Sequence, residues 1–157
     1  MQKVIQMGER EITLKSSAAT NILYKRLFKE DIIVKLTQFS KNMKEMQRIQ
    51  DSMNAIQGDE NKSKEQKVEE ISSLLESDAY KSANEFQSET LPKLAFIMYV
   101  EANEPADRIF SKLTEENYFT WLMSVDQGEL LSVTTQVIQL WNAGARNLSK
   151  LKNAEGR

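Results

Sequence analysis

Apolar residues fill almost every position between Leu91 and Asn103, so this segment has almost no polar side. A helix that is apolar all round belongs in an interior, because water on any side would leave apolar area exposed. The segment is shorter than the roughly 20 apolar residues that a membrane span needs, so the interior is that of the protein. Thr90 is the predicted N-cap, and Pro92 suits a first turn, whose amides lack helical partners. We predict a mainly α fold, a helical bundle around a central apolar helix at residues 91–103.

Residues 2–15 alternate apolar and polar side chains on both sides of Gly8-Glu9, which is the period of a β-strand. A two-residue turn with Gly first fits the type II′ geometry that matches the twist of paired strands. Such a turn places Ile5 opposite Ile12. We predict a short N-terminal β-hairpin that packs on helices, because two strands alone are only marginally stable.

Apolar residues at intervals of three and four predict helices over most of the chain after Ser16. A first helix is expected to end near Phe28, with Ile22, Leu23 and Leu27 turned inward. A longer helix, from Asp31 to about Ile56, carries the most regular pattern in the chain.

The last predicted helix begins after Asp126, a suitable N-cap, and runs from about Gln127 to Ala143. Gly144 suits its C-terminal end, because glycine adopts the left-handed conformation that often ends helices. Polar residues follow, and we expect 149–157 to be a flexible polar tail.

Residues 1–148 are predicted to form a single mainly helical domain. The polar, aperiodic stretch 57–65 is interpreted as a loop that joins two halves of this domain. The first residues alternate and lack a basic flank followed by a long apolar core, so no secretion signal is predicted.

The composition is that of an ordinary globular protein, with 40% hydrophobic and 28% charged residues among 157. A net charge of −2 argues against a general nucleic-acid binder, which needs a cationic surface to displace counterions. We therefore expect neither nucleic acid nor a membrane as partner. The small basic groups are interpreted as solvated helix faces: Lys25, Arg26 and Lys29, and later Arg146, Lys150, Lys152 and Arg157.

The chain contains no histidine and no cysteine, which excludes Ser–His and Cys–His dyads and thiolate metal sites. The remaining candidates are Glu101, Glu104 and Asp107, at the i, i+3, i+6 spacing by which all-helical nucleotide pyrophosphohydrolases bind Mg²⁺. Pro105 interrupts the helix inside this triplet. We therefore favour a solvated helix end, and predict no catalytic residues, cofactor or metal.

A stripe of methionines on the predicted helix 31–56 is the main candidate for a partner surface. Flexible thioethers can repack against varied apolar partners, although an apolar helical stripe usually faces the core. Gln50 interrupts the stripe, and a buried amide without partners costs about 1–3 kcal/mol, which favours an interface. The predicted partner-binding residues are Phe39, Met43, Met46, Gln50 and Met53.

The stretch GEREITLK, followed by SSAATNILYKRLFKEDII, resembles the N-terminus of small tail assembly chaperones from long-tailed bacteriophages and prophages of Gram-positive bacteria. There, a hairpin precedes a helix with an aromatic and basic residues, then a Phe and an Asp that opens an apolar run. Lys29 stands where such sequences often place Gly. The C-terminal stretch YFTWLMSVDQGELLSVTTQVIQLWN resembles the ending of the same family. The matching N-terminal positions are Tyr24, Lys25, Phe28, Asp31, Ile32 and Ile33.

The resemblance implies a non-enzymatic protein that coats the long, apolar, helical tape measure protein before tail polymerisation. It places the protein in the host bacterial cytoplasm, absent from the mature virion. It implies the tape measure protein as partner, the tail tube protein as a second candidate, and self-association, because many copies coat one client. Two alternatives stay open: a magnesium-dependent all-helical nucleotide pyrophosphohydrolase, and a small phage or prophage adaptor or transcription regulator.

Overall fold

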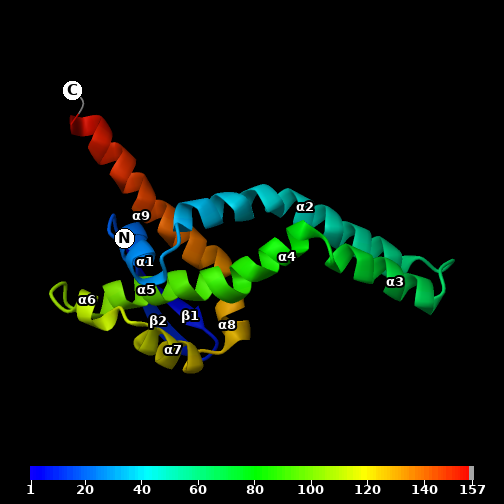
Figure 1. The fold of residues 1–157 in the computed structure, drawn as a ribbon, viewed down its shortest axis with the longest axis horizontal. Helices are drawn as coiled ribbons and strands as arrows, with labels where there is room; N and C mark the ends of the chain where they lie inside the picture. Colours follow the sequence, from blue (N-terminus) through cyan, green and yellow to red (C-terminus); the bar gives the residue numbers. More distant parts are fainter. Residues whose placement is uncertain (156–157) are drawn as a thin grey trace. The chain divides into compact units, whose positions relative to one another are not determined.

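A computed structural model describes the backbone of residues 1–155 and the side chains of residues 1–144 (Figure 1). The protein is mainly helical, with an N-terminal two-stranded antiparallel hairpin packed against helices, as predicted. The elements are β1 (Gln2–Met7), β2 (Arg10–Lys15), α1 (Thr20–Phe28), α2 (Ile32–Gly58), α3 (Lys64–Leu75), α4 (Asp78–Glu85), the π-helical turn η1 (Phe86–Thr90), α5 (Leu91–Asn103), α6 (Ile109–Lys112), α7 (Glu115–Met123), α8 (Gln127–Ser132) and α9 (Thr134–Glu155).

The chain divides into two compact units. Unit 1 comprises residues 1–32 and 87–157, and unit 2 comprises residues 33–86. The polar stretch 57–65, which was expected to join two halves, lies inside unit 2. There α2 ends at Gly58, and Ser63 caps α3 by accepting a hydrogen bond from the Gln66 amide at 3.2 Å. This stretch therefore turns the chain between two helices of one unit.

The hairpin has the predicted register, with Ile5 paired to Ile12. Gly8 has a φ of +60°, which a type II′ turn requires at its first position. Ile5 and Leu14 are fully buried, because β2 packs against α5 while β1 packs against α8 and α9. The apolar face of the hairpin thus forms part of the core of unit 1.

Helix α5 is the buried centre of unit 1, as its all-apolar sequence predicts. Its buried residues include Leu91, Pro92, Leu94, Ala95, Phe96, Ile97, Met98 and Val100. Thr90 occupies the N-cap position of α5, as predicted, but its side chain does not cap the helix. Thr90 has helical backbone angles and its side chain makes no capping hydrogen bond, because the chain enters α5 from the turn η1 without leaving a helical conformation.

Helix α1 buries Leu23, as predicted, and Leu27 is half-buried. The prediction for Ile22 was wrong, because Ile22 is 69% exposed and Tyr24 is buried. The reason is that α1 begins at Thr20, whose side chain is itself buried and fixes which side of the helix faces α5.

Lys29 ends α1 in the left-handed conformation, with a φ of 60°. The left-handed conformation costs a residue with a Cβ about 1 kcal/mol of conformational free energy, whereas glycine adopts it without this cost. We expect Lys29→Gly to raise the free energy of unfolding by about 0.5–1 kcal/mol in urea titrations. The matched change Lys25→Gly, inside the helix, should lower it by about 1 kcal/mol. A loss of stability in Lys29→Gly would contradict this explanation.

The C-terminal helix was predicted with the wrong boundaries. Val133 separates α8 from α9, and α9 continues to Glu155 instead of ending near Ala143. Gly144 is therefore buried inside α9 and does not cap it. The predicted tail 149–157 lies outside the residues whose side chains are described. Within the described residues, no helix is both long enough and apolar enough to cross a membrane.

Candidate functional site

Helices α2 and α3 of unit 2 run antiparallel, with a seam of half-buried side chains between them (Figure 1). The two helices also meet at their joined ends, where the Lys67 amine donates to the Gln57 carbonyl at 3.0 Å. Ile49 is the one seam residue that is fully buried. The seam residues are Asn42, Met46, Ile49 and Met53 of α2, and Lys67, Ile71 and Leu74 of α3.

An uncharged face lies on one side of this seam. It consists of the residue that follows each seam residue: Met43, Gln47, Gln50 and Asn54 of α2, and Val68, Ser72 and Leu75 of α3. On both helices, each residue of the set lies one position after a seam residue in the chain. Because the helices are antiparallel and right-handed, this displacement brings both sets to the same side of the helix pair. All seven side chains are exposed and none carries a charge.

The opposite side of the seam is charged. It consists of the residue that precedes each seam residue: Lys41, Glu45, Arg48 and Ser52 of α2, and Gln66, Glu70 and Ser73 of α3. Two ion pairs lie here, Arg48–Glu45 at 3.6 Å and Lys62–Glu70 at 2.5 Å. The hydrogen bond that the Lys62 ammonium donates to the Glu70 carboxylate raises the pKa of Lys62. The helix pair thus has one ordinary solvated face and one that is depleted of charge, as the centre of a protein interface is.

Three large apolar side chains stand out from the uncharged face. Met43 is 52% exposed, Val68 60% and Leu75 36%. The amides beside them are held by neighbours on α2, since Gln50 donates to Asn54 at 3.3 Å. The face is therefore neutral, partly apolar and fixed on two helices.

The structure distributes the predicted partner-binding residues over two environments. Phe39 is buried and stacks on Phe86, with ring centroids 4.1 Å apart. Met46 and Met53 lie in the seam, and only Met43 and Gln50 belong to the uncharged face. Val68 and Leu75 were not predicted from the sequence as partner-binding residues. Their displacement by one residue from Lys67 and Leu74 becomes meaningful only once the pairing of α2 with α3 is known.

The acidic triplet is not assembled. Glu101 is buried, and its carboxylate accepts hydrogen bonds from Ser17 at 2.5 Å and Thr20 at 2.6 Å. Glu104 is half-buried, and Asp107 is exposed. Among the residues with described side chains, no group of three carboxylates is placed to hold a metal ion. The Glu101 carboxylate fixes the start of α1 against α5.

Two buried tyrosines of unit 1 have perturbed acidity. Burial, followed by the charges of Glu89 and Glu30, raises the pKa of Tyr118 to about 12. Burial and the neighbouring Glu30 raise the pKa of Tyr24 further, and its hydroxyl donates to Glu30 at 3.1 Å. Both phenols stay protonated at neutral pH, and the Tyr24 hydroxyl serves as a hydrogen-bond donor.

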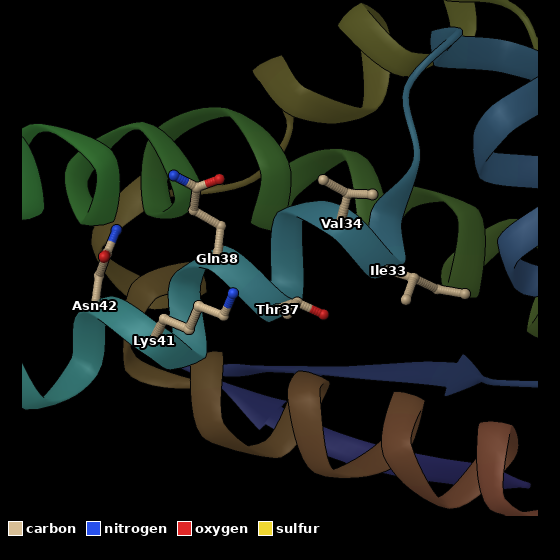
Figure 2. Close-up of a pocket in the computed structure, with 6 residues that line it drawn as sticks. All are labelled: Ile33, Val34, Thr37, Gln38, Lys41 and Asn42. Carbon is tan, nitrogen blue, oxygen red and sulfur yellow. The ribbon is translucent and has the colours of Figure 1, made fainter.

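A hollow of about 330 Å³ lies along the first turns of α2. Figure 2 shows its lining side chains on successive turns of this helix: Ile33, Val34, Thr37, Gln38, Lys41 and Asn42. Lys41 is the only titratable group of this lining. One amine without a carboxylate offers no acid–base pair, so this hollow is not a candidate active site.

No protein-family model, curated protein or solved structure matches this chain.

Proposed function

We propose that this protein is a non-enzymatic tail assembly chaperone, which binds and shields apolar helical segments of a tape measure protein on its uncharged face. The observation that carries the proposal is the contrast between the two sides of the α2–α3 pair. In a chain with 28% charged residues, all seven exposed side chains of this face are neutral, and three are large and apolar. Exposed apolar patches with a polar surround are typical of protein-binding sites.

The geometry of this face favours a helix as the ligand. Two antiparallel helices leave a groove between them, and both helices contribute exposed apolar side chains, Met43 from α2 and Val68 and Leu75 from α3. An amphipathic helix binds such a groove through anchors spaced by three and four residues. The neutral amides tolerate varied sequences, because no charge on the face requires a partner of opposite sign.

The resemblance described above supplies the kind of client. A hairpin followed by YKRLFKEDII, and the ending with a late Trp, are similar to proteins that coat a long helical client. The host cytoplasm would be the site of action, and the tail tube protein a second partner. The magnesium-dependent hydrolase gains no support, because Glu101 is held by two hydroxyls of α1 and of the turn before it.

Co-expression with a tape measure protein tests the proposal. The probe is the long, coiled-coil-rich product of the neighbouring gene, carrying an affinity tag. We expect the chain to be retained with this client, and the double variant Met43→Glu with Val68→Glu to lose retention about tenfold or more. Both positions are more than half exposed, so the variant should keep its helical circular dichroism and its unfolding free energy within about 0.5 kcal/mol.

Two matched variants make the result specific. Lys41→Glu with Ser52→Glu places the same two negative side chains on the opposite face, and should leave retention unchanged. Met46→Glu places a charge in the seam, and should lower the stability of unit 2, because a buried unpaired charge is costly. Equal retention of the uncharged-face variant and the wild type would refute this binding site. A salt-sensitive shift of DNA by the purified chain would instead indicate the regulator.

A further inference from the structure

Helix α7 of unit 1 carries a second exposed apolar surface, which the client site does not use. Phe119 is 57% exposed and Met123 is 82% exposed. They are four residues apart, so they form one ridge on the outer side of α7, while Tyr118 and Trp121 face inward. A hollow of about 370 Å³ adjoins this ridge, and Met123 itself, Pro92, Leu122, Val125 and Leu130 are its apolar lining residues.

The surroundings of this ridge are acidic. Glu115 and Glu116 lie one turn before Phe119 on the same helix. Glu89 follows Ser88, which lines the hollow, and its charge acts on Tyr118. The guanidinium of Arg10 is a basic group near this surface, and it is bound to the carbonyl of Ser124 at 2.6 Å. Across residues 87–144, eight carboxylates stand against three basic side chains. A ligand for this surface should be basic, with apolar anchors.

The sequence of this chain contains such a segment at its C-terminal end. Residues 145–157 hold four basic residues and one acidic residue, so this segment carries a net positive charge. Leu148 and Leu151 are three residues apart, the spacing of two anchors on a helix. The charge of this segment and its apolar spacing therefore complement the acidic ridge and the adjoining hollow.

A contact between the two must join different copies of the chain. The backbone of α9 is one continuous helix from Thr134 to Glu155, and it starts directly after α8, which lines the hollow through Leu130. At 1.5 Å per residue, the helix carries residues 145–155 roughly 17–32 Å along its axis from that start. Figure 1 shows α9 leading away from α7 and α8 within unit 1. A continuous helix cannot return its own end to this hollow.

We propose that the basic C-terminal segment of one copy docks on the Phe119–Met123 ridge and its hollow in a second copy. The two surfaces differ, so the contact is head-to-tail and leaves one free ridge and one free C-terminal segment at the ends of each assembly. Such assemblies grow by successive addition and become larger with concentration. This contact stands independently of the client site, because the uncharged face belongs to unit 2.

Sedimentation of complementary variants tests the proposal. Met123→Glu removes the ridge, and Lys150→Glu with Lys152→Glu reverses the charge of the C-terminal segment. We expect the wild type to form larger species as concentration rises from micromolar to near-millimolar, and each variant to stay monomeric. An equimolar mixture of the two variants should form dimers that do not grow. The reason is that only the C-terminal segment of the first and the ridge of the second remain intact.

Several outcomes would overturn the head-to-tail contact. A strictly monomeric wild type would do so, and so would a ridge variant that associates like the wild type. A mixture that stays monomeric would show that the two surfaces do not meet. Met43→Glu serves as the control for the client site and should leave the size distribution unchanged. If Met43→Glu alone abolished association, copies would meet through unit 2 and the proposal would be wrong.

Discussion

Glu101→Ala is expected to lower the free energy of unfolding by about 2–4 kcal/mol, because removal of this buried carboxylate leaves two hydroxyls without their acceptor. The side chain is 5% exposed and accepts from Ser17 and Thr20. Thr20 is fully buried and its hydroxyl also accepts from the Ser17 amide at 2.9 Å, so the loss propagates into the start of α1. Urea unfolding followed by circular dichroism measures the change.

The neighbouring carboxylate provides the control. Among the residues whose side chains are described, Glu104 is half-buried and its carboxylate accepts no hydrogen bond, so Glu104→Ala should stay within about 0.5 kcal/mol of the wild type. Thr20→Val should cost less in the Glu101→Ala background than alone, because the shared hydrogen bond is already lost. If Glu101→Ala and Glu104→Ala changed the unfolding free energy equally, Glu101 would not have the structural role assigned to it. Hydrolysis of a nucleoside triphosphate that is lost in a still-folded Glu101→Gln variant would support the enzyme alternative instead.

The elements that the sequence predicts correctly are those whose hydrophobic pattern is compatible with only one placement, whatever their distant neighbours are. Helix α5 has apolar residues on every side, so its burial does not depend on which neighbours surround it. The register of the hairpin follows from the two-residue turn at Gly8, since each strand position then has one possible partner. The predicted cap Asp126, which accepts a hydrogen bond from the Glu129 amide at 2.9 Å, likewise depends only on neighbouring residues.

The positions that were predicted wrongly depend on contacts between distant segments. Ile22 was predicted to face inward and Tyr24 does so instead, because the packing of α1 on α5 decides which side of the helix is buried. The seam of α2 shows the same ambiguity, since Asn42 and Met43 are adjacent and the less apolar of the two faces inward. A heptad pattern fixes a side of a helix only to within about one residue, or 100°. The uncharged face lies one residue from the seam, so a helical pattern alone cannot distinguish the two.

A glycine has two opposite meanings in a sequence, as the end of a helix or as a place where two segments come close. Gly144 belongs to the second kind. A Cβ on Gly144 would lie 2.2 Å from the Ser16 hydroxyl and 3.0 Å from the Ser16 carbonyl carbon. No pattern near Gly144 could show this, because Ser16 is far away in the sequence.

Gly144→Ala is therefore expected to destabilise unit 1, although alanine is the better helix former by about 1 kcal/mol. The clash involves backbone as well as side chain, so α9 must move away from the end of β2, and we expect a net loss of about 1–3 kcal/mol in the unfolding free energy. Gly58→Ala is the matched control, because a Cβ there meets nothing within 4 Å and should be neutral or slightly stabilising.

The second variant identifies the clash. Ser16→Gly removes the two side-chain atoms that a Cβ at Gly144 would overlap, so Gly144→Ala should cost less in that background than alone. Ser16→Gly also loses the 3.5 Å hydrogen bond from the Ser16 hydroxyl to the Trp141 carbonyl. The comparison must therefore be a double-mutant cycle of the wild type, the two single variants and the double variant. Additive losses, or a Gly144→Ala variant as stable as Gly58→Ala, would mean that α9 does not approach the end of β2 this closely in solution.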